Sequence, residues 1–293
     1  MEMTKKILVT GSSGILGNLL VKKLNEKYKV IGTTKRNGKK SKVKCDITKR
    51  EEVEKIIQKI RPDIIIHLAG ITGNMECEKN PKKTLETNVM GTYHILESIK
   101  DKKIKIIFAS SREVYGNSKQ KVDETSSLMP INLNGFTKMI SENLIKEFNI
   151  KYKIPYNILR FTNFYGENND KRGISKMFKE ALTGEKITIF GGEQSIDLIH
   201  YDDAVNAIVK TIDNNKNGVY NIGLGKSFKL LSILKILEKT SKMKFQYIKK
   251  KSRGVEVQKF SINTTKAKQE LQFEAKITPK IGIKKMVEKW KEN

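Results

Sequence analysis

The sequence contains few of the residues that mark metal-binding or disulfide-bonded proteins. Its 293 residues include 2 cysteines, 3 histidines and 5 prolines. Cys45 and Cys77 lack metal-ligand spacing, and such sparse use of cysteine predicts a reducing compartment and inert thiols. His67 lies within an apolar segment and is expected to be a core residue. No pair of histidines has the spacing of metal ligands, so no metal site is expected.

Long apolar segments are missing as well. No run of about 18 apolar residues occurs, so we expect no membrane-spanning helix and no membrane partner. The N-terminal letters MEMTKK lead directly into a short apolar strand and a glycine loop, which differs from a secretory signal peptide. These features predict a cytoplasmic protein.

Arginine is rare for a chain so basic. The formal net charge is +26, yet only 7 of the 58 basic residues are arginine, and the lysines are spread along the whole chain. Proteins that read nucleic acids tend to use arginine forks and focused basic patches. We therefore expect no nucleic-acid partner. A solvated lysine-rich surface explains the charge, and anionic small substrates are compatible with it.

The first half of the chain alternates between apolar strand segments and amphipathic helices. The expected strands are 5–11, 28–34, 42–47, 63–70, 103–111 and 156–164. The expected helices are 16–27, 50–60 and 82–100. The last of these carries one apolar stripe made of Leu85, Val89, Thr92, Leu96 and Ile99. This alternation predicts an α/β fold with a Rossmann-like, doubly wound parallel sheet.

The pattern loosens after the letters YGENND. Short strands are expected at 186–191 and 218–223, and helices at 202–213, 228–241 and 279–291. We expect residues 1–165 to form the Rossmann-like domain, with later segments returning to it. Residues 166–293 are expected to form mainly a smaller α/β lobe for the substrate.

A glycine loop, VTGSSGILG, follows the first strand and opens the first helix. Gly11 permits a tight turn, Gly14 lets the backbone approach a pyrophosphate, and Gly17 permits close packing of helix on strand. Ile15 and Leu16 open the helix, whose N-terminal N–H groups attract phosphate. A plain strand-to-helix turn is the alternative, but the context on both sides favours dinucleotide binding.

The end of the second strand bears on the choice of cofactor. An acidic residue there binds the ribose 2′-hydroxyl of NAD, whereas a basic residue accepts the 2′-phosphate of NADP. Thr33 and Thr34 are followed by Lys35 and Arg36, with no acid. NADP is therefore favoured over NAD, which stays possible because surface lysines are common in this chain.

A family resemblance extends over residues 6–290. Motifs occur in the order seen in extended short-chain dehydrogenases/reductases, namely TGSSGILG, CDIT, IIIHLAG, TNVMGTYHILES, FASSREVYG, LRFTNFYG, DLIHYDDAV and GVYNIG. These are the NAD(P)-dependent epimerases, dehydratases and reductases of nucleotide sugars. The letters VIGTTKR look most like those of enzymes that use NADP and GDP-sugars, which slightly favours a GDP-sugar. The resemblance also implies a homodimer through a helix pair that includes 82–100 and 137–149.

The resemblance implies roles for individual residues. Ser111 matches the active-site serine, and Lys138 matches the lysine that binds the nicotinamide ribose. The other cofactor-binding residues implied are Asp46 and Ile47 beside the adenine, Leu68, Ala69 and Gly70 after a strand, and Asn88 as a brace. The implied substrate-binding residues are Thr72, Asn163 and Arg253.

The sequence departs from the family at its catalytic position. Related enzymes carry a tyrosine base four residues before the lysine, and this chain has Asn134 there. A carboxamide exchanges no proton usefully near neutral pH. Another group could act, namely Glu113, Tyr115, Lys138 or a water held by Asn134. The enzyme could instead run a slow or single-turnover oxidation, or be a binding-only relative.

Glu113 stands where related dehydratases carry the glutamate that removes the C5 proton. The acid that normally precedes that glutamate is replaced by Arg112, which weakens a dehydratase assignment. The resemblance thus implies an NAD(P)-dependent oxidoreductase, epimerase or dehydratase acting around C4 of a nucleoside-diphosphate sugar, in glycan or modified-sugar synthesis. The alternative is a catalytically weak or inactive NAD(P)-binding relative that serves as a partner protein.

Overall fold

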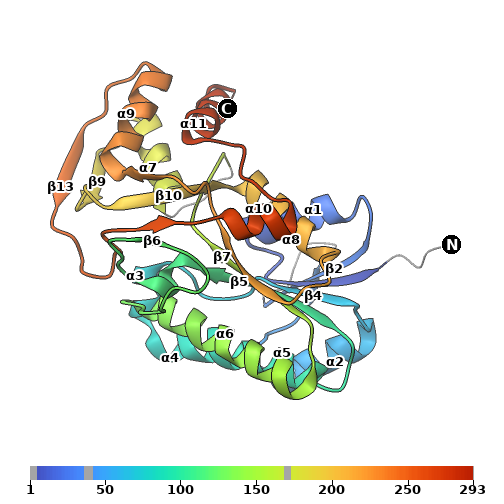
Figure 1. The fold of residues 1–293 in the computed structure, drawn as a ribbon. Coiled ribbons are helices and arrows are strands. Elements are labelled where there is room, and N and C mark those ends of the chain that lie inside the picture. Colours follow the sequence, from blue (N-terminus) through green and yellow to red (C-terminus); the bar gives the residue numbers. More distant parts are fainter. Residues whose placement is uncertain (1–4, 36–41, 168–172, 293) are drawn as a thin grey trace.

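The protein is built around a seven-stranded parallel sheet (Figure 1). The computed structural model describes residues 5–35, 42–167 and 173–292. The strand order is β11-β7-β5-β4-β1-β2-β3. The bounds are β1 (Lys6–Thr10), β2 (Lys29–Thr34), β3 (Lys42–Lys44), β4 (Ile64–His67), β5 (Lys105–Ser111), β7 (Tyr156–Phe161) and β11 (Gly218–Ile222). The order reverses beside β1, and ligands of open α/β sheets bind at the carboxyl ends of the strands at such a point.

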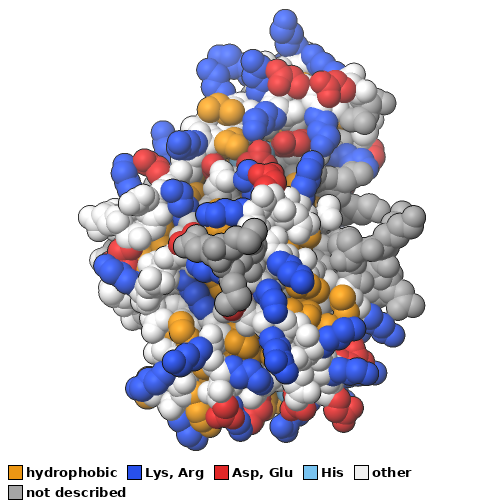
Figure 2. Space-filling model, turned by 90° about the vertical axis from the view of Figure 1, so that its right-hand side faces the viewer, with side chains coloured by type: hydrophobic (Ala, Val, Ile, Leu, Met, Phe, Trp, Pro, Cys, Tyr) orange, Lys and Arg blue, Asp and Glu red, His pale blue; other side chains and the backbone are white. Residues whose placement is uncertain are grey.

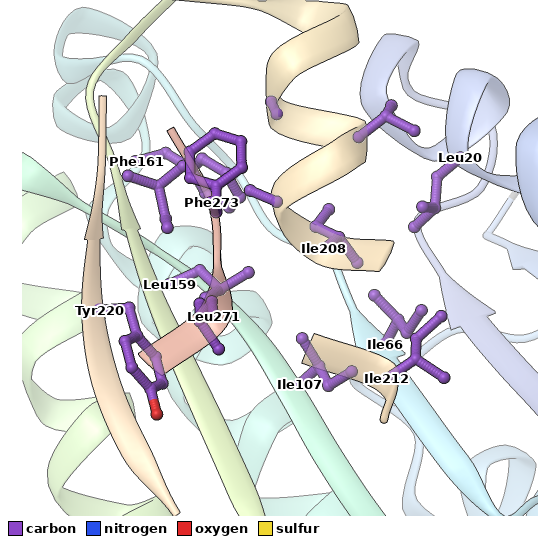
Figure 3. Packing of buried hydrophobic residues seen from close by; sticks show 14 of the residues in the cluster. Leu20, Ile66, Ile107, Leu159, Phe161, Ile208, Ile212, Tyr220, Leu271 and Phe273 are labelled. Atoms are coloured by element: carbon purple, nitrogen blue, oxygen red, sulfur yellow. The ribbon is translucent and has the colours of Figure 1, made fainter. Parts of the chain in front are cut away.

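Helices cover both faces of the sheet, which explains why its strands are apolar on both sides. One face carries α2 (Arg50–Ile60), α5 (Gly91–Ile99) and α6 (Leu133–Tyr152). The other carries α1 (Ile15–Leu24), α8 (Tyr201–Ile212) and α10 (Thr265–Leu271). Within β4, Ile65 packs on the first face, while Ile64 and Ile66 pack on the second. Figure 3 shows Ile208 and Leu20 meeting on the second face.

Strand β11 comes from the last third of the chain and yet forms an edge of this sheet. It pairs in parallel with β7, with Tyr220 opposite Leu159. The segment from residue 163 onward first crosses into a second layer before it returns. The central sheet therefore draws on residues beyond 165.

The second layer has its own core and lies above the sheet in Figure 1. Its strands are β8 (Asn163–Tyr165), β9 (Ile187–Phe190), β10 (Ser195–His200), β12 (Ser227–Lys229) and β13 (Tyr247–Lys250). Its helices are α7 (Gly173–Leu182), α9 (Leu230–Ser241) and α11 (Pro279–Lys291). A short ladder of β6 (Lys121–Val122) and β14 (Ser261–Ile262) ties a late segment to the first half of the chain. Within the described ranges, no helix is long and apolar enough to cross a membrane.

The helix predicted over 82–100 is present, but its first half is not a regular α-helix. The segment divides into α4 (Pro81–Leu85), a π-helical turn η1 (Glu86–Met90) and α5. A π turn holds one more residue than an α turn and shifts the buried face. Leu85, expected in the apolar stripe, is therefore 39% exposed, whereas Asn88 is 3% exposed. The polar Asn88 is turned inward at the carboxyl edge of the sheet.

Basic side chains are dispersed over the surface rather than gathered in one stripe on the face shown in Figure 2, where acidic side chains lie among them. Several lysines pair with glutamates three or four residues away, as Lys23 does with Glu26 and Lys176 with Glu180. Such exposed pairs contribute little to stability.

Candidate active site

The glycine loop between β1 and α1 leaves no room for side chains. Gly11 has a φ of +69°, and a Cβ placed on it would lie 2.7 Å from the backbone nitrogen of Ala69. A Cβ on Gly17 would lie 2.5 Å from the carbonyl oxygen of Gly11. The two glycines therefore let β1, β4 and α1 converge at the carboxyl edge of the sheet.

The N-terminus of α1 lies directly after this turn. Gly14 is its N-cap, with Ile15 and Leu16 in the first turn, and Gly14 provides no capping side chain. The first N–H groups of the helix are thus available to an anion, and the helix dipole favours negative charge there. This cradle fits the pyrophosphate of a dinucleotide.

The end of β2 places a lysine beside an aspartate. Lys35 Nζ lies 2.8 Å from Asp46 Oδ2 in the loop after β3. Burial opposes ionisation of Asp46, but hydrogen bonds from Lys35 and Thr48 hold the pKa of its carboxyl below the usual range. Ile47 follows, and its side chain packs against Gly91 of α5. Arg36, predicted to bind the cofactor, lies outside the described residues.

Asn88 braces the loop that follows β4. Its Oδ1 accepts from Ile71 N at 2.8 Å, and its Nδ2 donates to Ile71 O at 2.9 Å and to Thr137 Oγ1 at 3.0 Å. Leu68, Ala69 and Gly70 precede this brace and are half-buried. The π turn is what directs Asn88 inward, so it joins the loop to α6.

Lys138 of α6 reaches the same edge. Its Nζ donates to Ala109 O of β5 at 2.7 Å, and a Cβ on Gly70 would lie 3.8 Å from this Nζ. Burial lowers the pKa of Lys138 to about 8, although Cys77 and Glu142 act in the opposite direction. The structure thus brings Gly70, Asn88 and Lys138, three residues predicted to bind the cofactor, together at one edge of the sheet.

Ser111 ends β5 and caps a single 3-10 turn, η2 (Arg112–Tyr115). Its Oγ accepts from the backbone nitrogen of Glu113 at 3.2 Å. Glu113 is 5% exposed, and Arg112 Nη2 lies 2.8 Å from its Oε1. Its Oε2 accepts from Asn132 at 2.6 Å and from Asn74 at 3.2 Å. Both carboxylate oxygens are therefore occupied.

Asn134 lies in the first turn of α6, one turn before Lys138. It is 6% exposed, and its Nδ2 donates to Asn74 Oδ1 at 3.3 Å. Its Oδ1 is buried and has no hydrogen-bond partner in the part of the chain that the structure describes. The Oδ1 atom of Asn134 is thus a hydrogen-bond acceptor without a donor, one asparagine away from Glu113.

The side chains of Asn74, Asn132, Asn134 and Glu113, together with the carbonyl group of Val255, form what we call the amide cluster. Asn74 and Asn132 each donate to Val255 O at 3.0 Å. Val255 belongs to the segment between β13 and β14, so the cluster ties the second layer to the end of β5. Sequence analysis missed Asn74, Asn132 and Val255. Asn132 alone carried a signal, because asparagine is a favoured N-cap before a helix.

The predicted substrate-binding residues lie in different surroundings. Arg253 is paired with Glu256 and stacks on Phe190, its guanidinium carbon 4.3 Å from the ring centroid. Asn163 of β8 has a buried Oδ1 that lacks a hydrogen-bond partner among the described residues. Thr72 follows the Asn88 brace and is half-buried.

His67 is a satisfied core residue. Its two ring nitrogens lie 2.7 Å from Thr10 Oγ1 and 3.1 Å from Thr92 Oγ1. Burial lowers its pKa to about 3, and the charge of Lys138 adds to this. The two cysteines are also buried, and burial raises the pKa of each thiol to about 11.

Folding does bring one group of metal-ligand side chains together, which spacing in the sequence could not show. Glu167, His200 and Asp202 place one ligand atom each within 4.8 Å of one another. However, His200 Nε2 lies 2.8 Å from Glu167 Oε2, and His200 Nδ1 accepts from the backbone nitrogen of Asp202. Both ring nitrogens of His200 have protein partners, and His200 is the N-cap of α8. These contacts explain why the three side chains lie together without a metal ion.

Comparisons with known proteins agree with this geometry. The model of the NAD dependent epimerase/dehydratase family matches residues 7–223. A putative UDP-glucose 4-epimerase from Methanocaldococcus jannaschii is 34% identical, over 98% of this chain and 99% of the relative.

Two solved structures are similar over the same length. The UDP-glucose 4-epimerase of Thermotoga maritima, solved with UDP-glucose, is 30% identical with a TM-score of 0.92. The UDP-glucuronic acid 4-epimerase of Bacillus cereus, solved with UDP-glucuronic acid and NAD, is 27% identical with a TM-score of 0.90. Each match covers 98% of this chain and 99% of the other. This chain therefore belongs to the NAD-dependent epimerase/dehydratase family.

Proposed function

We propose that this protein oxidises a hydroxyl around C4 of a nucleoside-diphosphate sugar, as an epimerase or a related enzyme of glycan or modified-sugar synthesis. The observation that carries the proposal is the meeting of Gly11, Gly70, Asn88 and Lys138 at one edge of the sheet. We assign the cofactor to residues 1–165 and the sugar nucleotide mainly to 166–293. The ligands of the solved relatives support a UDP-sugar over a GDP-sugar.

The cofactor assignment rests on the cradle formed by Gly11, Gly17 and the start of α1. These residues would hold a nicotinamide dinucleotide, which would supply reversible hydride transfer at a sugar carbon. Gly14, Ile15 and Leu16 would hold its pyrophosphate, and Asp46 and Ile47 its adenine end. Leu68, Ala69 and Gly70 would line its path toward Lys138.

The proton of the reacting hydroxyl needs an acceptor other than a tyrosine. Glu113 already accepts three hydrogen bonds. The hydroxyl of Tyr115 donates to Asn221, and burial raises its pKa to about 12. Among the side chains Lys138 remains, because burial lowers the pKa of its amine to about 8, and we propose it over a water held by Asn134. In its neutral form Lys138 takes the hydroxyl proton, while Ser111 donates a hydrogen bond to the same oxygen.

The decisive experiment is a substrate panel. UDP-glucose, UDP-glucuronic acid and GDP-mannose are incubated with NAD⁺ or NADP⁺, and the products are separated by chromatography and identified by mass spectrometry. We expect slow turnover of a UDP-sugar, because a missing acid–base group typically costs ~10²–10⁴-fold. Tight cofactor binding with no turnover of any compound would instead support the inactive partner protein.

Replacement of Lys138 tests the proton step. Lys138→Met should lower kcat by at least ~100-fold, because it removes the proton acceptor. In the unmodified enzyme kcat should rise as pH increases through about 8, because the neutral amine is the active form. Lys138→Arg keeps a cation that cannot lose its proton, and retained activity in that variant would contradict the assignment.

The glycine loop offers a matched pair of variants for the cofactor site. Gly11→Ala combines a φ of +69° with a clash against Ala69 and should abolish NAD binding in calorimetry. Gly184, before β9, has a φ of +76°, and a Cβ placed on it would have no atom of the described ranges within 4 Å. Gly184→Ala should therefore cost ~1–2 kcal/mol of stability from backbone strain and leave NAD binding intact.

The preference between NADP and NAD depends on Lys35. We propose that NADP is favoured, because Lys35 is exposed and can leave Asp46 for a 2′-phosphate, and no acid follows β2. Lys35→Ala should then weaken NADP⁺ binding by ~5-fold or more and leave NAD⁺ binding unchanged. Equal effects on both cofactors would show that Lys35 does not read the 2′ position.

We also propose a homodimer through α5 and α6, which pack against each other. Phe136 and Ile150 are 44% and 66% exposed, and their spacing places them on one face of α6. Ile150→Glu should shift the sedimentation coefficient to that of a monomer. Ile281→Glu, at a residue 48% exposed on α11, is the control and should leave it unchanged.

A further inference from the structure

The hydrogen-bond directions in the amide cluster are fixed by groups that can only accept. A carboxylate and a backbone carbonyl have no hydrogen to donate. Asn74 and Asn132 both contact Glu113 Oε2 and Val255 O, at distances between 2.6 and 3.2 Å. Both asparagines must therefore turn their NH₂ groups toward these two oxygens.

The carbonyl ends of the same two asparagines must then point away. Asn132 Oδ1 accepts from Gly135 N at 2.9 Å and caps α6. Asn74 Oδ1 faces Asn134 and can only accept, so Asn134 has to present its Nδ2, which it does at 3.3 Å. Glu113 thus sets the orientation of the Asn74 amide, and Asn74 in turn sets the orientation of the Asn134 amide.

This chain of contacts leaves Asn134 Oδ1 as the free end. The atom is buried, and no donor for it exists in the described part of the protein. A buried acceptor without a donor is unfavourable, so a ligand that brings one gains affinity. Asn134 lies one helical turn before Lys138, which places this acceptor at the edge where Gly70 and Lys138 meet.

We propose that, in the bound sugar, the hydroxyl at the reacting carbon donates its hydrogen bond to Asn134 Oδ1 until it turns its proton to Lys138. In this proposal Glu113 is a positioning residue that, with the carbonyl group of Val255, fixes the orientation of Asn134. The inference rests on the proposed function and extends it to substrate recognition. An amide oxygen accepts but does not donate, so the site selects an alcohol over a sugar that lacks this hydroxyl. Glu113 acts through Asn74 rather than as a base.

The test compares UDP-glucose with UDP-4-deoxyglucose, bound to the NAD-loaded protein and measured by calorimetry. The unmodified protein should bind the deoxy compound roughly 5- to 10-fold more weakly, the value of one buried hydrogen bond. Asn134→Leu should bind the two compounds equally, so that the ratio of their dissociation constants falls to about 1. Asn134→Ala is the second variant if the leucine does not fold, and it should have the same effect.

Glu113→Gln tests the orienting role, because it keeps the shape of the side chain and removes its charge. It should reduce the ratio in part, since a Gln amide can also donate, while the carbonyl group of Val255 still accepts from Asn74. Glu124→Gln is the matched control, because Glu124 accepts from the backbone of Asn221 and has no contact with Asn134 in the described structure. It should leave the ratio unchanged.

The outcomes separate this inference from the proposed function. Binding of UDP-glucose with an unchanged ratio in the Asn134 variants would overturn the acceptor role and leave the proposed function standing. A changed ratio in the Asn134 variants but not in Glu113→Gln would overturn the orienting role. Binding of neither compound, nor of any sugar in the panel, would overturn both proposals.

Discussion

Strand β5 ends in two neighbouring serines that lead to two different arginine–glutamate pairs. Ser110 Oγ donates to Glu142, which binds Arg160 of β7. Ser111 Oγ accepts from the backbone of Glu113, which is paired with Arg112. Consecutive side chains of a strand point to opposite faces, so one pair lies under the helices and the other beside the amide cluster.

The two pairs differ in how completely they are satisfied. Arg160 donates through Nε and Nη2 to Glu142 at 3.0 and 2.6 Å, and through Nη1 to the hydroxyl of Tyr115 at 2.7 Å. Burial alone would lower the pKa of Arg160, but Glu142 and Tyr115 raise it above its usual range. Arg112 contacts Glu113 through Nη2, while its buried Nε and Nη1 have no hydrogen-bond partner within the described ranges.

The difference separates a pair that stabilises the fold from a pair that has hydrogen-bonding groups left for a ligand. The Arg160 pair is closed and can only stabilise the fold. The Arg112 pair is open, because Nε and Nη1 of Arg112 are unused, and the unused acceptor Asn134 Oδ1 belongs to the amide cluster that Glu113 shares. Unused polar groups of this kind are costly in a core, and they are characteristic of sites that bind a ligand.

The largest expected effect comes from breaking the closed pair. Glu142→Gln leaves the buried charge of Arg160 uncompensated and should lower the free energy of unfolding by ~3–5 kcal/mol. Urea denaturation measures this. Glu113→Gln should cost less than half as much, because Arg112 already lacks most of its partners. An equal loss of unfolding free energy in Glu142→Gln and Glu113→Gln would show that the open pair stabilises the fold as much as the closed pair does.

An intermediate effect is expected from Tyr115, whose hydroxyl accepts a hydrogen bond from Arg160 of the closed pair. Tyr115→Phe removes a hydroxyl that accepts from Arg160 and donates to Asn221, and leaves both partners buried. The loss should be ~1–3 kcal/mol in the same denaturation experiment. Tyr247→Phe, at a residue 49% exposed, is the control and should change stability little.

The last effect depends on pH and concerns Asp197, on which the charge of Arg112 in the open pair acts. Burial raises the pKa of Asp197 to about 7, although a hydrogen bond from Leu224 N and the charge of Arg112 act against this. Between pH 4 and 7 the folded state then holds a proton that the unfolded state has lost. Unfolding free energy relative to Asp197→Asn should therefore fall as pH rises from about 4 to about 7. A flat difference between the two proteins would contradict the raised pKa.

The glycine loop and the doubly wound parallel sheet could be predicted from the sequence because both depend on local patterns. Gly11 and Gly17 are needed by the backbone itself, and the alternation of apolar segments is a consequence of a sheet covered on both faces. The roles expected for Asn88 and Lys138 came from the family motifs that contain them, and they stay predictions.

The amide cluster could not be predicted, because its members come from four separate segments. Asn74 follows β4, Asn132 caps α6, Glu113 lies in η2 and Val255 comes from the second layer. No periodicity links such positions. Glu142 and Arg160 were also missed, although an arginine within a strand segment as apolar as YNILRF signals a buried partner.

The π turn at Glu86–Met90 has a consequence for how this chain can vary in length. Deleting one residue there would restore a regular α-helix, and each residue on one side of the cut would rotate by about 100° relative to the other. Asn88 would leave Ile71 and Thr137, and the loop after β4 would lose its attachment to α6. We therefore expect the segment Glu86–Met90 to accept neither the insertion nor the deletion of one residue, although most side chains of the flanking helix α4 are exposed.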